Sequence, residues 1–144
     1  MSSSLLARLR EQPGVYVGTG DGPESGPFTA RIEVGTSIDR LGCTIAYEAW
    51  DGPEHKHREQ TLLAPAMDGG SVLTVLCQEL PGLAVLPEAR PGVFSNHAGS
   101  DDFRIEIGIT LEGATPTLTY SWSWAVPGAE LREQSRATVQ RLDA

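Results

Sequence analysis

The chain has 144 residues, of which 40% are apolar, and this length suits one domain with a core of its own. Its formal net charge is −8 and its one lysine is Lys56. The sequence therefore predicts neither a nucleic-acid partner nor an anionic membrane partner, because both need clustered Lys and Arg side chains. No apolar run is long enough for a membrane helix or a signal peptide, and we expect a cytoplasmic protein.

The first twelve residues are predicted to form one short helix. Ser2, Ser3 and Ser4 are good N-cap residues, and three leucines follow at helical spacing (Leu5, Leu6, Leu9). Pro13 and Gly14 end the pattern. The apolar face of this helix is too small to form a core, so we expect it to pack on another part of the chain.

From residue 28 onward the hydrophobic period changes to two. Four segments alternate clearly between apolar and polar positions, with these apolar faces: Phe28, Ala30, Ile32 and Val34; Leu41, Cys43, Ile45 and Tyr47; Phe103, Ile105, Ile107, Ile109 and Leu111; Leu118, Tyr120, Trp122, Trp124 and Val126. This alternation is typical of antiparallel strands with one buried face.

Turn signals rich in Gly, Pro and Asp divide the remainder into about ten strands. The predicted strands are 14–20, 27–36, 40–50, 54–64, 71–79, 82–87, 92–96, 102–112, 116–126 and 130–141; the last could also be a helix. Consecutive hairpins form either a sandwich or a barrel. Short turns favour a sheet that closes into a barrel, and a closed barrel has no exposed strand edges. We predict an all-β fold: one up-and-down, calycin-like or lipocalin-like barrel over residues 14–141, within a single domain of residues 1–144.

A barrel of eight or more strands can hold a small ligand inside. The aromatic strand and Tyr47 would line such a cavity, although aromatic side chains on a strand can equally fill a core. The predicted apolar contacts are Tyr47, Tyr120, Trp122 and Trp124, and the predicted polar contacts are Gln134 and Arg136. An inward Arg136 could pair with a ligand carboxylate, whereas an outward one would be solvated. The first functional hypothesis is therefore binding of a small hydrophobic or amphipathic molecule.

Another hypothesis is a metal-dependent enzyme. His55, His57 and Glu59 would share one face of a regular strand, and two imidazoles with a carboxylate form a recognised shell for zinc or iron. His97 could add a fourth ligand from a loop. The alternative interpretation of the same residues is a solvated, charged strand near a turn.

Several segments, in order, resemble the nitrobindin type of fatty-acid-binding-protein-like barrel. They are the opening 14–20 (GVYVGTG), the segment 41–59, and the closing segments 124–128 (WAVPG) and 136–141 (RATVQR). The resemblance implies a ten-stranded barrel, and it implies haem bound through a histidine of the last strand, with nitric oxide or peroxynitrite chemistry. The matching position here is Gln134, or Ser135 in a shifted register, and no histidine follows His97.

Haem binding is therefore kept as an alternative function, with His55, His57 or His97 as the remaining candidate ligands. A barrel without the iron ligand would resemble the wider fatty-acid-binding and lipocalin-like carriers of small apolar molecules. Two further alternatives stay open at this point: a packed barrel with no cavity that acts through its surface, and a homodimer.

Overall fold

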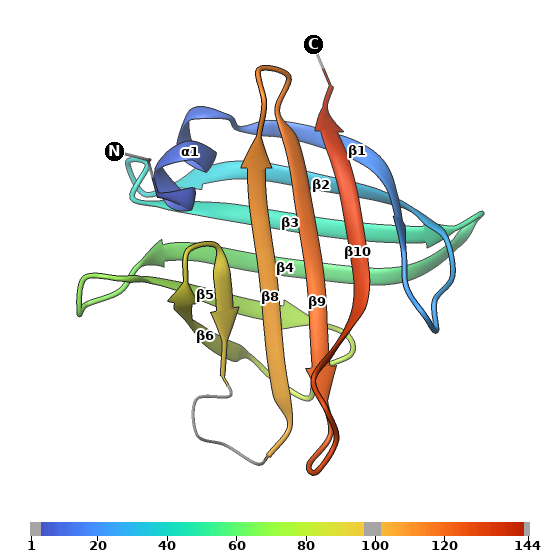
Figure 1. Cartoon of the computed structure of the whole chain (residues 1–144). Helices are drawn as coiled ribbons and strands as arrows, with labels where there is room; N and C mark the ends of the chain where they lie inside the picture. The colour runs from blue at the N-terminus through green and yellow to red at the C-terminus, as the bar shows by residue number, and fades with distance from the viewer. Residues whose placement is uncertain (1–3, 97–101, 143–144) are drawn as a thin grey trace.

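The computed structural model describes residues 4–96 and 102–142, and it shows one short helix followed by ten strands (Figure 1). The elements are α1 (Leu5–Glu11), β1 (Gly14–Asp21), β2 (Phe28–Ser37), β3 (Gly42–Asp51), β4 (Glu54–Pro65), β5 (Ser71–Cys77), β6 (Ala84–Arg90), β7 (Val93–Ser95), β8 (Arg104–Glu112), β9 (Thr117–Ala125) and β10 (Arg132–Arg141). The predicted all-β fold with a short N-terminal helix is confirmed.

Helix α1 begins where the sequence predicts. The Ser4 hydroxyl accepts a hydrogen bond from the Ala7 backbone N–H at 3.1 Å and so caps the first turn. The three leucines of the helix are all buried, and the helix packs against β2, β3 and β8. The helix therefore contributes its apolar face to the interior of the barrel, as expected from its small size.

The strands form a closed up-and-down barrel in which β1 pairs with β10. Residues 132–141 are thus a strand, not a helix. A side chain at Gly18 would place its Cβ 2.1 Å from the Thr138 carbonyl oxygen, and one at Gly20 would lie 2.3 Å from the Phe28 ring. These two glycines are therefore needed where β1 packs closely against β10 and against the Phe28 ring.

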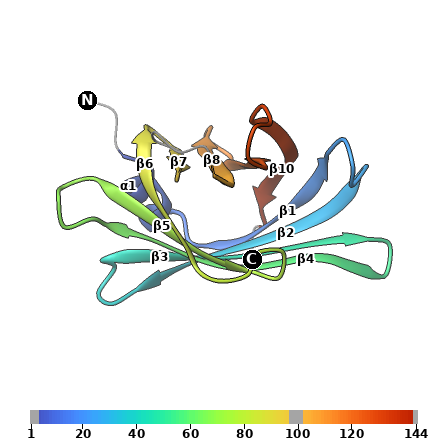
Figure 2. The ribbon, with the colours of Figure 1, turned by 90° about the horizontal axis from the view of Figure 1, so that it is seen from below.

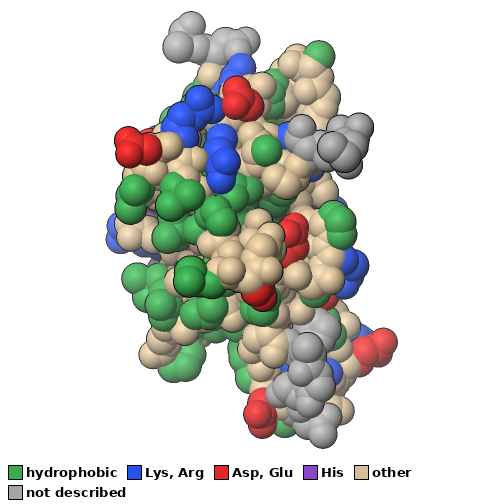
Figure 3. Space-filling view, turned by 90° about the vertical axis from the view of Figure 1, so that its left-hand side faces the viewer, with side chains coloured by type: hydrophobic (Ala, Val, Ile, Leu, Met, Phe, Trp, Pro, Cys, Tyr) green, Lys and Arg blue, Asp and Glu red, His purple; other side chains and the backbone are tan. Residues whose placement is uncertain are grey.

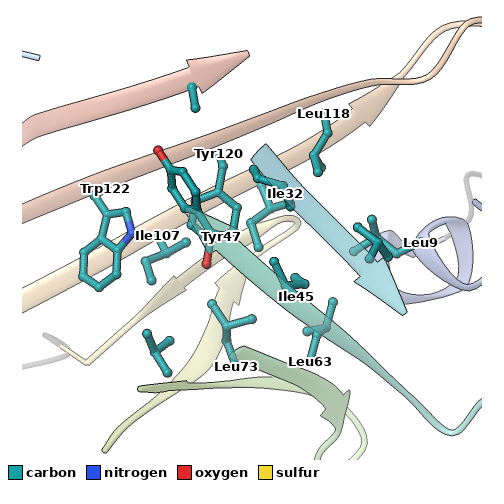
Figure 4. Close-up of a cluster of buried hydrophobic side chains, with 14 of the residues drawn as sticks. Leu9, Ile32, Ile45, Tyr47, Leu63, Leu73, Ile107, Leu118, Tyr120 and Trp122 are labelled. Carbon is teal, nitrogen blue, oxygen red and sulfur yellow. The ribbon is translucent and has the colours of Figure 1, made fainter. Parts of the chain in front are cut away.

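Two groups of strands cross at a steep angle, with β2, β3 and β4 on one side and β8, β9 and β10 on the other (Figures 1 and 2). Their inward side chains form one continuous core. Figure 4 shows its two parts: Leu9, Ile45, Leu63 and Leu118 lie toward the helix, and Tyr47, Tyr120 and Trp122 lie toward the opposite end. The aromatic face of β9 therefore points into the barrel.

The predicted apolar faces extend one residue too far at three strand ends. Leu41, Phe103 and Val126 lie just outside β3, β8 and β9, and their exposed fractions are 56%, 40% and 51%. At these positions the chain leaves the sheet for a turn, so the inward–outward alternation no longer applies.

Hydrophobic side chains also gather on the outer surface of the molecule (Figure 3). On neighbouring strands β4, β5 and β6, the outward Leu62, Leu76 and Val85 are all exposed. Such a surface is compatible with a protein partner, and the homodimer stays a prediction. Within the described part of the chain, no helix has the length and apolar character needed to cross a membrane.

Candidate functional site

A cavity of about 570 Å³ opens at the end of the barrel opposite α1. Its wall combines aromatic, apolar, polar and ionisable side chains. The residues that line it are Glu24, Ser25, Phe28, Tyr47, Ala49, Asp51, Lys56, His57, Cys77, Glu79, Leu80, Phe103, Trp122, Trp124, Gln134 and Ser135. In an up-and-down barrel every second turn lies at the same end. The turns after β1, β3, β5 and β9 therefore surround this opening together.

Four of the six predicted ligand contacts line this cavity: Tyr47, Trp122, Trp124 and Gln134. Sequence reasoning missed most of the other wall residues, including Asp51, Glu79 and Phe103. They belong to turns or strand ends, where no alternation marks an inward side chain. The order of the hairpins was the available signal, because it brings these turns to one end.

Tyr120 is fully buried and does not line the cavity, so its position does not support the predicted apolar contact with a ligand. Its hydroxyl instead donates a hydrogen bond to Glu59 Oε2. The same oxygen accepts from the Thr61 hydroxyl at 2.6 Å, and Glu59 Oε1 accepts from the Trp122 indole N–H at 3.0 Å. The Glu59 side chain has no exposed surface, so these donors replace the water that the carboxylate loses.

His57 connects this buried carboxylate to the cavity wall. Its Nε2 lies 3.0 Å from Glu59 Oε1, and its Nδ1 lies 3.0 Å from Glu79 Oε1. A carboxylate can only accept, so both ring nitrogens donate when the imidazole is protonated. The rings of Tyr47 and Trp122 pack edge-on around the imidazole, with centroids 5.0 and 6.0 Å away.

The two carboxylates raise the pKa of His57. Burial is the largest single influence and acts to lower the pKa, but the hydrogen bonds and charges of Glu59 and Glu79 together outweigh it. Burial also raises the pKa of both cavity-end tyrosines, and the charge of Glu59 adds to this effect. Tyr47 and Tyr120 therefore stay neutral, and Tyr120 keeps the proton that it donates to Glu59.

The predicted metal triad does not converge, because β4 carries a β-bulge. Ala49 pairs with His57 and Trp50 pairs with His55, which leaves Lys56 as the extra residue. His57 therefore faces inward, whereas His55 stacks on outward Trp50 at 4.9 Å and contacts Glu48 at 3.1 Å. The described residues contain no group of three or more His, Cys, Asp or Glu side chains arranged for a metal, and His97 lies outside them.

A second bulge changes the interpretation of β10. Ser123 pairs with Glu133 and Trp122 pairs with Ser135, so Gln134 is the extra residue and reaches the cavity. Arg136 lies outside the cavity, where its guanidinium binds Glu133 at 2.6 Å. The predicted contact of Arg136 with a ligand carboxylate therefore has no support from this cavity. The extra residues of both bulges, Lys56 and Gln134, line the same opening.

Comparison with solved structures finds the crystal structure of Rv2717c from M. tuberculosis. The two folds superpose with a TM-score of 0.72 at 16% sequence identity, over 99% of this chain and 100% of the other. At this identity the likeness concerns the fold alone. No protein-family model matches the chain, and no curated protein matches it by sequence.

The cavity wall does not fit the haem ligation that a nitrobindin resemblance implies. The two positions that correspond to the haem histidine, Gln134 and Ser135, both line the cavity, and neither carries an imidazole. Among the described residues His57 is the one histidine on the wall, and carboxylates occupy both its nitrogens. Iron binds a neutral imidazole nitrogen, and the raised pKa of His57 favours the protonated form.

Proposed function

We propose that the protein binds a small amphipathic molecule, with mainly apolar contacts, in the cavity at the open end of the barrel. The observation that carries this proposal is the cavity itself. Its volume of about 570 Å³ falls within the range of small-molecule sites. The exposed surface of its wall is mainly apolar, although eight of its sixteen lining residues are polar or charged. The ten-stranded barrel is compatible with this function.

Trp124 is the best residue for testing the proposal. It is half-buried, lines the cavity and packs against Phe103 with ring centroids 6.0 Å apart. Trp122 is less suitable, because it also donates to Glu59, and its removal would disturb the interior. Trp50 offers a matched control: it is a tryptophan near the same end of the barrel, but it lies on the outer face of β3.

The experiment is titration with the neutral fluorophore N-phenyl-naphthylamine, whose emission rises in an apolar site. We expect saturable binding to one site per chain, about tenfold weaker binding to Trp124→Leu, and unchanged binding to Trp50→Leu. Absence of saturable binding would contradict the proposal. An equal loss in the two variants would also contradict it, because the probe would then bind elsewhere.

Haem binding is supported only by the likeness of the barrel. With no neutral imidazole offered by the described wall, we expect hemin to form no complex that survives gel filtration. A persistent Soret band with the unaltered protein would restore the haem alternative and would require an iron ligand other than His57.

A further inference from the structure

The cavity wall is rich in aromatic rings. Five of them come from four separate segments of the chain: Phe28 from β2, Tyr47 from β3, Phe103 from the residue before β8, and Trp122 and Trp124 both from β9. Each ring has a negative face that attracts a cation positioned within about 6 Å of its centre. A guest in this cavity therefore meets ring surfaces from several directions.

The charges around these rings are predominantly negative. Glu24, Asp51 and Glu79 line the cavity, and among the described wall residues Lys56 is the one lysine or arginine. The Lys56 ammonium lies 3.2 Å from the Glu54 carboxylate, which partly neutralises it. The protein as a whole carries a net charge of −8, so the background field has the same sign.

His57 does not reverse this sign. Its imidazole lies between the carboxylates of Glu59 and Glu79, so the three groups together keep one net negative charge when it is protonated. Each ring nitrogen already has an acceptor, so the imidazolium has no N–H left for an anionic guest. The arginine that sequence reasoning assigned to a ligand carboxylate, Arg136, lies outside with Glu133.

We propose, building on the ligand-binding function above, that the ligand is an organic cation: an aromatic or aliphatic group with an amine or quaternary ammonium. Its apolar part fills the aromatic cavity, and its cationic group lies among the rings and the carboxylates of Glu24, Asp51 and Glu79. A carboxylate ligand of similar size is rejected, because it meets these three acidic side chains and no unpaired donor on His57.

The test compares three probes of nearly equal shape and different charge. They are naphthylmethyl-trimethylammonium, its neutral isostere neopentylnaphthalene and the anion naphthylacetate, each measured by displacement of N-phenyl-naphthylamine. We expect the cation to bind about tenfold more tightly than the isostere, and the anion to bind about tenfold less tightly. The preference should shrink at about 0.5 M salt, which screens the rim charges.

The outcomes separate this inference from the function on which it depends. If the neutral probe and the isostere bind but the cation gains nothing, the cation preference is wrong and ligand binding stands. Tighter binding of naphthylacetate would likewise overturn the cation preference. If neither the neutral fluorophore nor any of the three compounds binds, the proposed function itself fails.

Two double variants, each lacking two carboxylates, test whether the preference for a cation arises at the cavity wall. Glu24→Gln with Asp51→Asn removes two carboxylates from the cavity wall, whereas Glu11→Gln with Glu112→Gln removes two near the helix end. We expect the first to weaken the cation about fivefold and leave the isostere unchanged, and the second to change neither. An equal effect of both would mean that only the overall charge of the protein matters, which would contradict a cation site among these side chains.

Discussion

At both ends of the barrel every second side chain of a strand points inward, but one end is filled and the other contains a cavity. At the end near α1, aliphatic side chains fill the interior, and Leu5, Leu6 and Leu9 of the helix close it. At the other end the inward positions carry Tyr47, Tyr120 and Trp122 around a buried carboxylate, and a cavity remains. No helix covers that opening in the described part of the chain.

This difference shows that closure depends on the chemistry of the inward side chains as well as on the sheet. Aliphatic groups pack without directional requirements, so a helix can simply add leucines to them. A buried carboxylate must keep its hydrogen-bond donors, and these fix the orientation of Tyr120, Trp122 and His57 around Glu59. Directional hydrogen bonds therefore stabilise the polar end, whereas close packing of aliphatic side chains stabilises the end near α1.

The largest expected effect comes from removing the centre of the polar end. In Glu59→Ala, the buried hydroxyls of Tyr120 and Thr61 and the indole of Trp122 lose their acceptor, and His57 loses a counter-charge. We expect the free energy of unfolding to fall by about 3–5 kcal/mol in urea titrations. The conservative Glu59→Gln keeps one acceptor oxygen and should lose less. Equal losses in the two variants would show that the hydrogen bonds contribute little.

The helix end gives a somewhat smaller effect of a different kind. Leu9 is completely buried, and Leu9→Ala leaves a cavity that aliphatic neighbours fill only in part. We expect a loss of about 3 kcal/mol in the free energy of unfolding. Binding of N-phenyl-naphthylamine should stay unchanged under conditions in which the variant is folded. Weaker probe binding would show that the two ends are coupled through the core.

Much of the fold could be predicted, because alternation and turn residues report directly on strands. The segments around Ile32, Ile107 and Tyr120 became strands with the expected inward faces. The site was predictable only in part. Tyr47, Trp122 and Trp124 were assigned to the cavity from their face of the strand, but Glu59 was assigned to a metal and not to a hydrogen-bond network.

The failures have a common physical cause in the two bulges. Each inserts one residue, Lys56 or Gln134, and so moves the residues beyond it to the other face. His55 thereby separates from His57, and Gln134 reaches the cavity while Arg136, two residues further on, faces outward. Neither bulge has a glycine that would mark it in the sequence, so strict alternation was the reasonable assumption and gave the wrong faces.

The smallest expected effect is a pH dependence specific to the polar end. The charged groups around His57 are Glu59 and Glu79, and they raise its pKa above the ordinary value of 6.5. Since the folded state holds this proton more tightly, the stabilisation is complete below the unfolded pKa and is lost as pH rises through the folded one. The free energy of unfolding should therefore fall across that window, above about pH 6.5, relative to His57→Gln.

The measurement is the difference in unfolding free energy between the unaltered protein and His57→Gln, taken from urea titrations at several pH values. This difference should shrink with rising pH. A constant difference for His57→Gln would mean that its proton is held no more tightly when folded. His57 would then connect Glu59 to the cavity as a neutral imidazole, and the net charge assigned to His57, Glu59 and Glu79 would have to be revised.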